Sequence, residues 1–279
     1  MLQVARLAPT VLGDEASVLI RDFVLSQLHP SGLFQNRGGN PDLYYTSFAT
    51  DILTALQIPI PEATLTAIPI HKADDFVHHC CHARLLSTLP DPPAPDFQPI
   101  ESYRTPDGGY NQRQDAPTGS AYAALLAYGA YADHKQLPPA PDPLLASIDT
   151  LRCPDGGYAN DLDLPIGGTP PTAAAVTLLR NFQRPVPETV EPFFYSCFHE
   201  SGGFKAFHDA PMPDLLSTAV TLHALDGLQS DFAKLRDPIL DYIDTLWTAD
   251  GGFHGNWSDD TLDIEYTYYG LLALGHLAV

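Results

Sequence analysis

The sequence predicts an all-α protein: one closed toroid of six inner and six outer helices, with residues 1–279 as a single domain. Three observations predict this fold. A glycine-rich turn recurs at intervals of 46 to 49 residues, an apolar helical run follows each turn, and proline clusters mark the joints. A period in this range is typical of a chain built from one repeated supersecondary unit.

The recurring turn consists of two glycines followed by an aromatic residue. Its full copies are Pro106–Tyr110 and Pro154–Tyr158, both with the sequence Pro-Asp-Gly-Gly-Tyr. Weaker copies end at Phe204 and Phe253, and a frayed copy ends at Phe34. The first glycines of the four clear copies lie at positions 108, 156, 202 and 251, so the copies are 48, 46 and 49 residues apart.

Apolar residues spaced at i, i+3, i+4 and i+7 after each turn predict an inner helix. The six expected runs are Tyr45–Leu56, Asp75–Leu89, Thr118–Tyr131, Thr172–Phe182, Asp214–Leu228 and Asp263–Leu277. A second stretch before the next turn predicts an outer helix, most clearly at Glu15–Leu28, Pro143–Leu151 and Phe232–Trp247. Six such pairs can close on themselves, which leaves no apolar end uncovered.

Composition narrows the classes of function. The formal net charge of −20 disfavours nucleic acid and anionic membranes as partners, because both need basic patches. There is no apolar run of 18 residues and no signal-peptide pattern, which predicts a cytoplasmic protein without a transmembrane segment. Four cysteines do not make a disulfide framework in a chain of this length.

The Gly-Gly-aromatic turn, polar loop and apolar helix resemble the repeats of the prenyltransferase β-subunit and terpenoid cyclase superfamily. That superfamily includes squalene–hopene cyclases and zinc-dependent protein prenyltransferases. The last unit, Gly251–Leu271, is similar to the end of a geranylgeranyltransferase β subunit, and the resemblance covers Gly32 to Leu277. It implies the toroid fold and an isoprenoid or similarly apolar substrate in the lumen. The resemblance also implies a possible helical partner subunit, and a homodimer is the alternative.

The residues do not complete the zinc site that the resemblance implies. Protein prenyltransferases bind zinc through an Asp, a Cys two residues later and a His in the last inner helix. Asp214 stands at the first position, but Leu216 and Tyr266 stand at the other two. One oxygen ligand is not a credible zinc site, so no metal is expected. His208 and Pro211 replace the cations that grip diphosphate. No cofactor is expected, and Mg²⁺ would enter only with a diphosphate substrate.

Polar residues at the start of the inner helices have a structural interpretation. A recurring Asp at a helix start is typical of an N-cap, which accepts hydrogen bonds from otherwise unpaired backbone N–H groups. This interpretation applies to Asp75, Asp214 and Asp263. The threonines that follow the starts of the units are expected to serve in packing: Thr172, Thr218 and Thr267.

Helical phase predicts which side chains face an apolar, aromatic-lined lumen. The third and sixth positions of the units select Phe48, Asp51, His78, Cys81, Ser217, Val220, Tyr266 and Tyr269. Phe48, Cys81, Tyr266 and Tyr269 are the expected substrate-binding residues. Asp51 lies in an otherwise uncharged helix, and a buried carboxyl needs a partner or has its pKa raised. With His78 as that partner, Asp51 could protonate an alkene or epoxide, as in squalene–hopene cyclases, although their Asp-x-Asp-Asp motif is absent. The alternative is a structurally paired or solvated Asp51.

Glu265 is the third catalytic candidate. It follows Asp263 by two residues and precedes Tyr266, Tyr268 and Tyr269, whose rings could stabilise a carbocation. The same aromatic residues could equally be core.

Two patterns resemble metal sites but are expected not to be. In the first, His78 and His82 share a helix face beside Cys81, without an external ligand. In the second, Asp259, Asp260 and Asp263 spell the Asp-Asp-x-x-Asp pattern, here in a loop of an acidic chain.

The sequence thus predicts a zinc-independent enzyme of the terpenoid cyclase or prenyltransferase type. The alternative is a non-catalytic toroid that binds a lipid, a peptide or a partner subunit. A third interpretation, a polysaccharide lyase or hydrolase, would need paired carboxylates and basic residues along a cleft, and the chain has only 14 Lys plus Arg.

Overall fold

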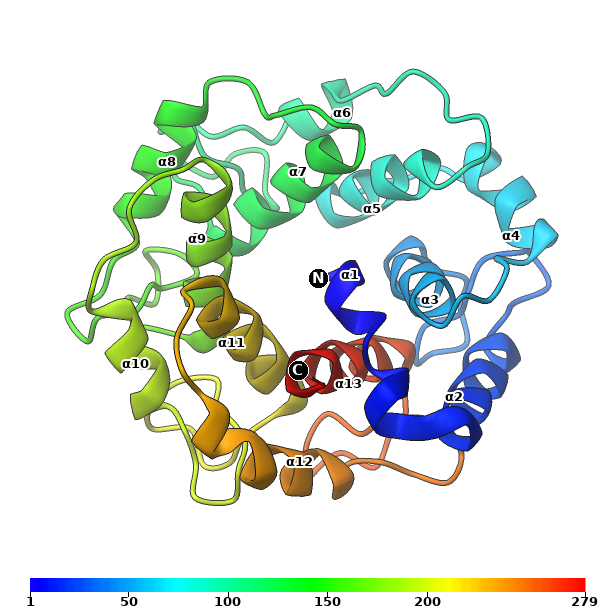
Figure 1. Cartoon of the computed structure of the whole chain (residues 1–279). Helices are drawn as coiled ribbons and strands as arrows, with labels where there is room; N and C mark the ends of the chain where they lie inside the picture. The colour runs from blue at the N-terminus through cyan, green and yellow to red at the C-terminus, as the bar shows by residue number, and fades with distance from the viewer. Residues whose placement is uncertain (279) are drawn as a thin grey trace. The chain divides into compact units, whose positions relative to one another are not determined.

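A computed structural model describes residues 1–278, and every regular element in this range is a helix (Figure 1). These residues form no β-strand. Their only β-type pairs are isolated bridges, such as the one between Phe198 and Phe204. The all-α prediction is therefore confirmed. The chain divides into two compact units: Met1–Ala67 together with Phe194–Val279, and Ile68–Phe193. We refer to them as unit 1 and unit 2.

Unit 1 is built from both ends of the sequence. Its helices are α1 (Leu2–Ala5), α2 (Pro9–Ser26), α3 (Leu43–Ala55), α4 (Glu62–Ala67), α11 (Leu215–Gly227), η2 (Ala233–Leu235), α12 (Arg236–Asp244) and α13 (Ile264–Leu277). The apolar helix α13 packs between α11 and α3, and it also contacts α1, α2 and α12. The last inner helix thus lies beside the first one (Figure 1).

Unit 2 repeats the same arrangement. It contains η1 (Ile68–Ile70), α5 (Phe76–Ser87), α6 (Gln98–Glu101), α7 (Ala121–Asp133), α8 (Pro141–Asp149) and α9 (Thr169–Asn181), and α10 (Val190–Ser196) contains the boundary between the units. Helix α7 packs between α5 and α9, and α8 covers α7 and α9. All six predicted inner helices therefore form, whereas the closure of a ring of six pairs and the single domain stay predictions.

The ends of the inner helices follow their caps. Asp75, Asp214 and Asp263 accept hydrogen bonds from backbone N–H groups three residues later, at 2.8, 2.7 and 2.8 Å, so the N-cap prediction is confirmed. Asp42 and Ser120 do the same for α3 and α7. These two caps were not predicted, and they explain why α3 starts earlier and α7 later than expected. Each cap satisfies one backbone donor at a helix start.

The first glycine of every turn has a left-handed backbone that side chains rarely adopt. Its φ is +92° at Gly32, +91° at Gly108, +95° at Gly156, +103° at Gly202 and +86° at Gly251. Each of these glycines lies against the next outer helix or the residue just before it. A Cβ at Gly202 would overlap the carbonyl oxygen of Pro238 in α12, and one at Gly251 would overlap that of Leu19 in α2. Glycine is therefore required both for the turn and for the close contact.

A threonine ties most of the turns to their inner helix. Thr218 accepts a hydrogen bond from the backbone N–H of Phe204 at 2.9 Å, and Thr46, Thr172 and Thr267 do the same for Phe34, Tyr158 and Phe253. Thr172, Thr218 and Thr267, which were expected to serve in packing, are fully buried and each also binds a backbone donor. The unit that begins at Ser120 has Ala124 at this position. There the Asp107 carboxylate binds the N–H groups of Gly109 and Gly119 instead.

Thr218→Val is expected to lower the free energy of unfolding by about 1–3 kcal/mol, because the N–H of Phe204 would be buried without an acceptor. Thr221→Val is the matched control. Thr221 lies on the same helix, is equally buried, and its hydroxyl has no hydrogen-bond partner. Urea unfolding of both variants measures the difference. Equal costs for the two substitutions would show that the bond to Phe204 contributes nothing.

Candidate functional site

The strongest candidate site lies in unit 1, where one face of α3 meets the start of α13. Tyr44, Phe48 and Asp51 share that face of α3, because their spacing is i, i+4 and i+7. The Tyr44 hydroxyl donates a hydrogen bond to Glu265 of α13 at 2.7 Å. Phe48 contacts the ring of Tyr44 edge-on, with ring centroids 4.9 Å apart. The site therefore combines a carboxyl group with an aromatic surface.

Helix α13 supplies the other half of the aromatic surface. The Phe48 ring centroid lies 5.3 Å from that of Tyr268 and 5.7 Å from that of Tyr269. Tyr268 is buried, while Phe48 and Tyr269 keep part of their surface accessible. The structure thus brings together three of the predicted residues: Phe48, Glu265 and Tyr269.

Glu265 has the electrostatics of a proton-transfer group. Burial raises the pKa of its carboxyl to about 7, and the negative charge of Asp263 adds to the rise. The hydrogen bond from Tyr44 and the positive charge of Arg37 act in the opposite direction. Since this pKa is near neutrality, Glu265 is suited to both give and accept a proton.

Arg37 engages the acidic motif that precedes α13. Its Nε lies 2.5 Å from Oδ2 of Asp263, and its Nη1 lies 2.7 Å from Oδ2 of Asp259. The guanidinium also lies over the ring of Tyr266, 5.4 Å from its centroid. Although burial lowers the pKa of Arg37, the two carboxylates raise it further, so the group stays charged. The Asp-Asp-x-x-Asp pattern therefore holds a guanidinium, and two of its carboxylates do not fit a magnesium site.

The residues at the zinc-binding positions of the resembled family make other contacts in this structure. Asp214 accepts hydrogen bonds from the backbone N–H and the hydroxyl of Ser217, both at 2.7 Å, and burial raises its pKa. Leu216 offers no ligand atom. Tyr266 packs its ring against Gly255, where a Cβ would collide with it. These residues do not fit a zinc ion.

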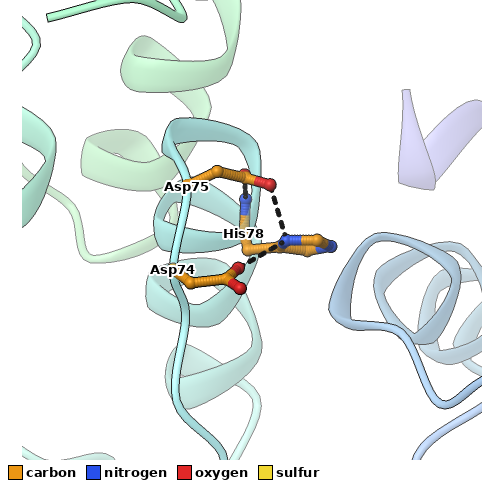
Figure 2. A group of neighbouring side chains, drawn as sticks. All are labelled: Asp74, Asp75 and His78. Atoms are coloured by element: carbon orange, nitrogen blue, oxygen red, sulfur yellow. Dashed lines mark hydrogen bonds and ion pairs between the residues drawn. The ribbon is translucent and has the colours of Figure 1, made fainter.

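His78 lies at the start of α5 in unit 2, between two carboxylates (Figure 2). Its Nδ1 is 2.9 Å from Oδ2 of Asp75 and 3.4 Å from Oδ1 of Asp74. One ligand atom from each residue lies within 4.8 Å of the others, so this group could hold a divalent ion. Both aspartates are exposed, and each carboxylate already pairs with the imidazole.

The other metal-like pattern on α5 joins His78 and His82 beside Cys81. His82 binds the carbonyl oxygen of Ile68 through Nε2 at 2.9 Å, and Cys81 is 2 % exposed. The prediction that this run is not a metal site stays a prediction. Asp51 is partly buried in unit 1 and His78 lies in unit 2. Their pairing stays a prediction, and so does the substrate contact of Cys81.

A second buried polar group lies near the end of α13. His276 receives or donates a hydrogen bond with His223 of α11, with Nε2 and Nδ1 3.0 Å apart. Its Nδ1 is 3.6 Å from Oδ2 of Asp226. Burial lowers the pKa of His276 to about 4, although the charge of Asp226 opposes the change. This imidazole is therefore neutral at physiological pH.

Sequence reasoning missed Tyr44 and Arg37. Tyr44 carried a usable signal, since it precedes Phe48 by four residues and therefore shares its helix face. Arg37 carried none, because it lies in a loop 226 residues away from Asp263 in the sequence. Among residues 1–278, no helix has the length and apolar character needed to cross a membrane.

Comparison with known proteins supports the fold. Residues 172–278 match the family model of the prenyltransferase alpha-alpha toroid domain. The chain is similar to the type II terpene cyclase MstE from Scytonema, with 10% identity, coverage of 99% of this chain and 98% of that one, and a TM-score of 0.60. An α-1,6-mannanase, GH76A of Salegentibacter sp. HEL1_6, has 13% identity, coverage of 95% and 98%, and a TM-score of 0.57.

A protein geranylgeranyltransferase-I from Candida albicans matches with 15% identity, coverage of 99% of this chain and 83% of that one, and a TM-score of 0.49. No relative was found among curated proteins. At these identities the structural matches show an α/α-toroid fold, which hosts both isoprenoid and carbohydrate chemistry.

Proposed function

Because this chain has the toroid fold of the prenyltransferase and terpenoid cyclase superfamily, we propose that it is an enzyme of that type which works without zinc. Its substrate in this proposal is an isoprenoid or a similarly apolar molecule, and its location is the cytoplasm. A helical partner subunit or a second copy of the chain would complete the assembly.

The observation that carries the proposal is the environment of Glu265. Its carboxyl is partly buried and accepts a hydrogen bond from Tyr44, and burial raises its pKa to about 7. Catalytic acids and bases work best when their pKa lies near the working pH. Carboxyl groups whose pKa is strongly shifted by burial are found often at functional sites.

The aromatic surface beside Glu265 supports the choice of substrate class. Tyr44, Phe48, Tyr268 and Tyr269 pack in tilted and edge-on pairs along α3 and α13. The faces of such rings attract a cation and exclude water from it. This surface suits the carbocations that form when isoprenoids cyclise or ionise.

The pKa of Glu265 also indicates its step. A carboxyl that titrates near pH 7 is a weak acid, and it would protonate a plain alkene slowly. It is well suited to remove the final proton from a carbocation, or to protonate an epoxide oxygen as the ring opens. Asp51 lies on the same face of α3 beyond Phe48, and we keep it as the proposed proton donor for the first step.

Glu265→Gln tests this proposal. Glutamine keeps the shape and the hydrogen bond from Tyr44 but cannot transfer the proton, so turnover should fall roughly 10²-fold or more. The assay follows product formation from isoprenoid diphosphates, squalene-like alkenes and epoxides, alongside melting temperature and lipid binding. Asp51→Asn tests the proposed proton donor of the first step, whereas Glu265→Gln tests the group proposed for the last step. Glu15→Gln, at an exposed position of α2, is the control.

Tyr44→Phe gives a second readout. It removes a hydrogen bond that lowers the pKa of Glu265, so the pH profile of turnover should shift to higher pH. A folded Glu265→Gln protein with full turnover would remove this residue from the mechanism. Lipid binding without turnover of any substrate class in the wild type would favour the alternative, a non-catalytic binding toroid.

A further inference from the structure

A cavity of about 270 Å³ is lined only by residues of unit 2, whereas the site on α3 and α13 belongs to unit 1. Two loops line it, and each follows a Gly-Gly-Tyr turn. The lining residues that carry the argument below are Arg113, Ser120, Asn160, Asp161, Leu162 and Asp163. The cavity is polar and has no aromatic side chain, so it is not the aromatic-lined lumen that the sequence predicts. Its volume is below the usual range for small-molecule sites and is sufficient for one long side chain.

Hydrogen bonds hold the loop around Asn160 in place. The Asn160 carbonyl accepts from the N–H of Ala121 at 2.8 Å, and its side-chain Oδ1 accepts from the N–H of Tyr122 at 3.1 Å. These bonds attach the loop to the first turn of α7. The Asp161 side chain then accepts from the N–H of Asp163 at 3.0 Å, which fixes the next turn. The cavity is therefore preformed.

The charges of this loop are not balanced within the structure. Among the described residues, no Lys, Arg or His forms an ion pair with Asp161 or Asp163, and the side chain of Arg113, another lining residue, forms none either. The lining thus carries two carboxylates and one guanidinium, so its net charge is negative. With an overall charge of −20, the surrounding field also favours an approaching cation.

Apolar side chains on the same loop are unusually exposed. Leu162, Leu164 and Ile166 are 46, 64 and 50 % exposed, and they are three of the ten large hydrophobic residues exposed in the described part of the chain. They alternate with Asp161 and Asp163. Exposed apolar side chains that gather in one short segment are typical of a surface that another molecule covers.

We propose that this loop and its cavity form a docking surface for a peptide segment of a partner protein. The segment carries a Lys or Arg flanked by apolar side chains. The cation enters the cavity beside Asp161 and Asp163, and the apolar neighbours cover Leu164 and Ile166. The carboxylates disfavour an anionic membrane as the occupant, and the small volume disfavours an oligosaccharide. This surface is independent of the proposed enzymatic site.

Selection from a phage-displayed library of random heptapeptides on the immobilised full chain tests the proposal. We expect enrichment of peptides with one Lys or Arg between apolar residues. A synthetic consensus peptide should then bind at least about 10-fold more weakly to Asp163→Asn/Leu164→Ser, and its affinity for the wild type should fall with salt. Asp163 is suitable for substitution because its side chain makes no hydrogen bond within the loop. Only its backbone N–H does, to Asp161.

The control variant is Asp91→Asn/Leu137→Ser. It removes a carboxylate and an exposed apolar side chain elsewhere in unit 2, where Leu137 is 58 % exposed. It should bind the peptide like the wild type. No enrichment, enrichment of acidic or polar peptides, or equal binding to both variants would overturn the proposal. Sedimentation that shows a dimer abolished by Leu164→Ser would also overturn it, since a second copy would then be the occupant.

Discussion

Gly202→Ala is expected to lower the free energy of unfolding by about 4 kcal/mol, an unusually large effect for one methyl group. Two costs add. The backbone of Gly202 has a φ of +103°, where a side chain is strained by about 1–3 kcal/mol. The new Cβ would also overlap the carbonyl oxygen of Pro238, so α12 must move away from the turn. Chemical unfolding measured in urea would give the value.

Gly39→Ala separates these two costs. Gly39 has a φ of +77°, but nothing lies within 4 Å of an added Cβ. Its substitution should therefore cost only the backbone strain, about 1–2 kcal/mol. The difference between the two variants measures the contact between turn and outer helix. Equal losses would mean that α12 accommodates the methyl group freely and that this contact is not tight.

The second large effect concerns pH, where two buried groups in unit 1 act with opposite signs. The pKa of Glu265 rises from 4.5 to about 7 on folding, so its stabilising contribution is complete below pH 4.5 and is lost as the pH rises through 7. The pKa of His276 falls from 6.5 to about 4, so its contribution is complete above pH 6.5 and is lost as the pH falls through 4. Each change amounts to about 3 kcal/mol.

Differences between variants and wild type isolate the two groups, since all other titrations cancel. Relative to wild type, Glu265→Gln should gain about 3 kcal/mol of stability between pH 4 and pH 8. Relative to wild type, His276→Gln should gain a similar amount of stability as the pH falls from 7 to 4. Unfolding free energies at five or six pH values would show both slopes. A difference that does not vary with pH would contradict the burial of that group's charge.

The positions of the helices could be predicted from the sequence because each helix has local sequence signals. The Gly-Gly-aromatic turns, the aspartate caps and the apolar spacing are all read within about a dozen residues, and all six inner helices form where they predict. Unrecognised caps shifted the starts of α3 and α7, at Asp42 and Ser120, whereas α9 starts three residues earlier than expected without a side-chain cap. Local physics thus fixes both the type and the approximate position of each element.

The candidate site was only partly predictable, because its contacts join distant segments. Phase analysis predicted that Phe48 and Tyr269 face the lumen, and the position of Glu265 two residues after Asp263 made it a candidate. The pKa of Glu265 depends on burial and on Tyr44, which lies 221 residues away in the sequence. The ion pairs of Arg37 have the same origin. No pattern in one segment reports which partner the fold brings to it.

The construction of unit 1 from both ends of the chain has a consequence for synthesis on the ribosome. Helices α2 and α3 emerge early, but the turn at Gly251 and the rings of α13 that cover them are made last. At 5–20 residues per second, the wait is on the order of 10–40 s. During that interval the face of α3 that packs against α13 lacks its native partner, and this nascent segment is where a chaperone would be needed most.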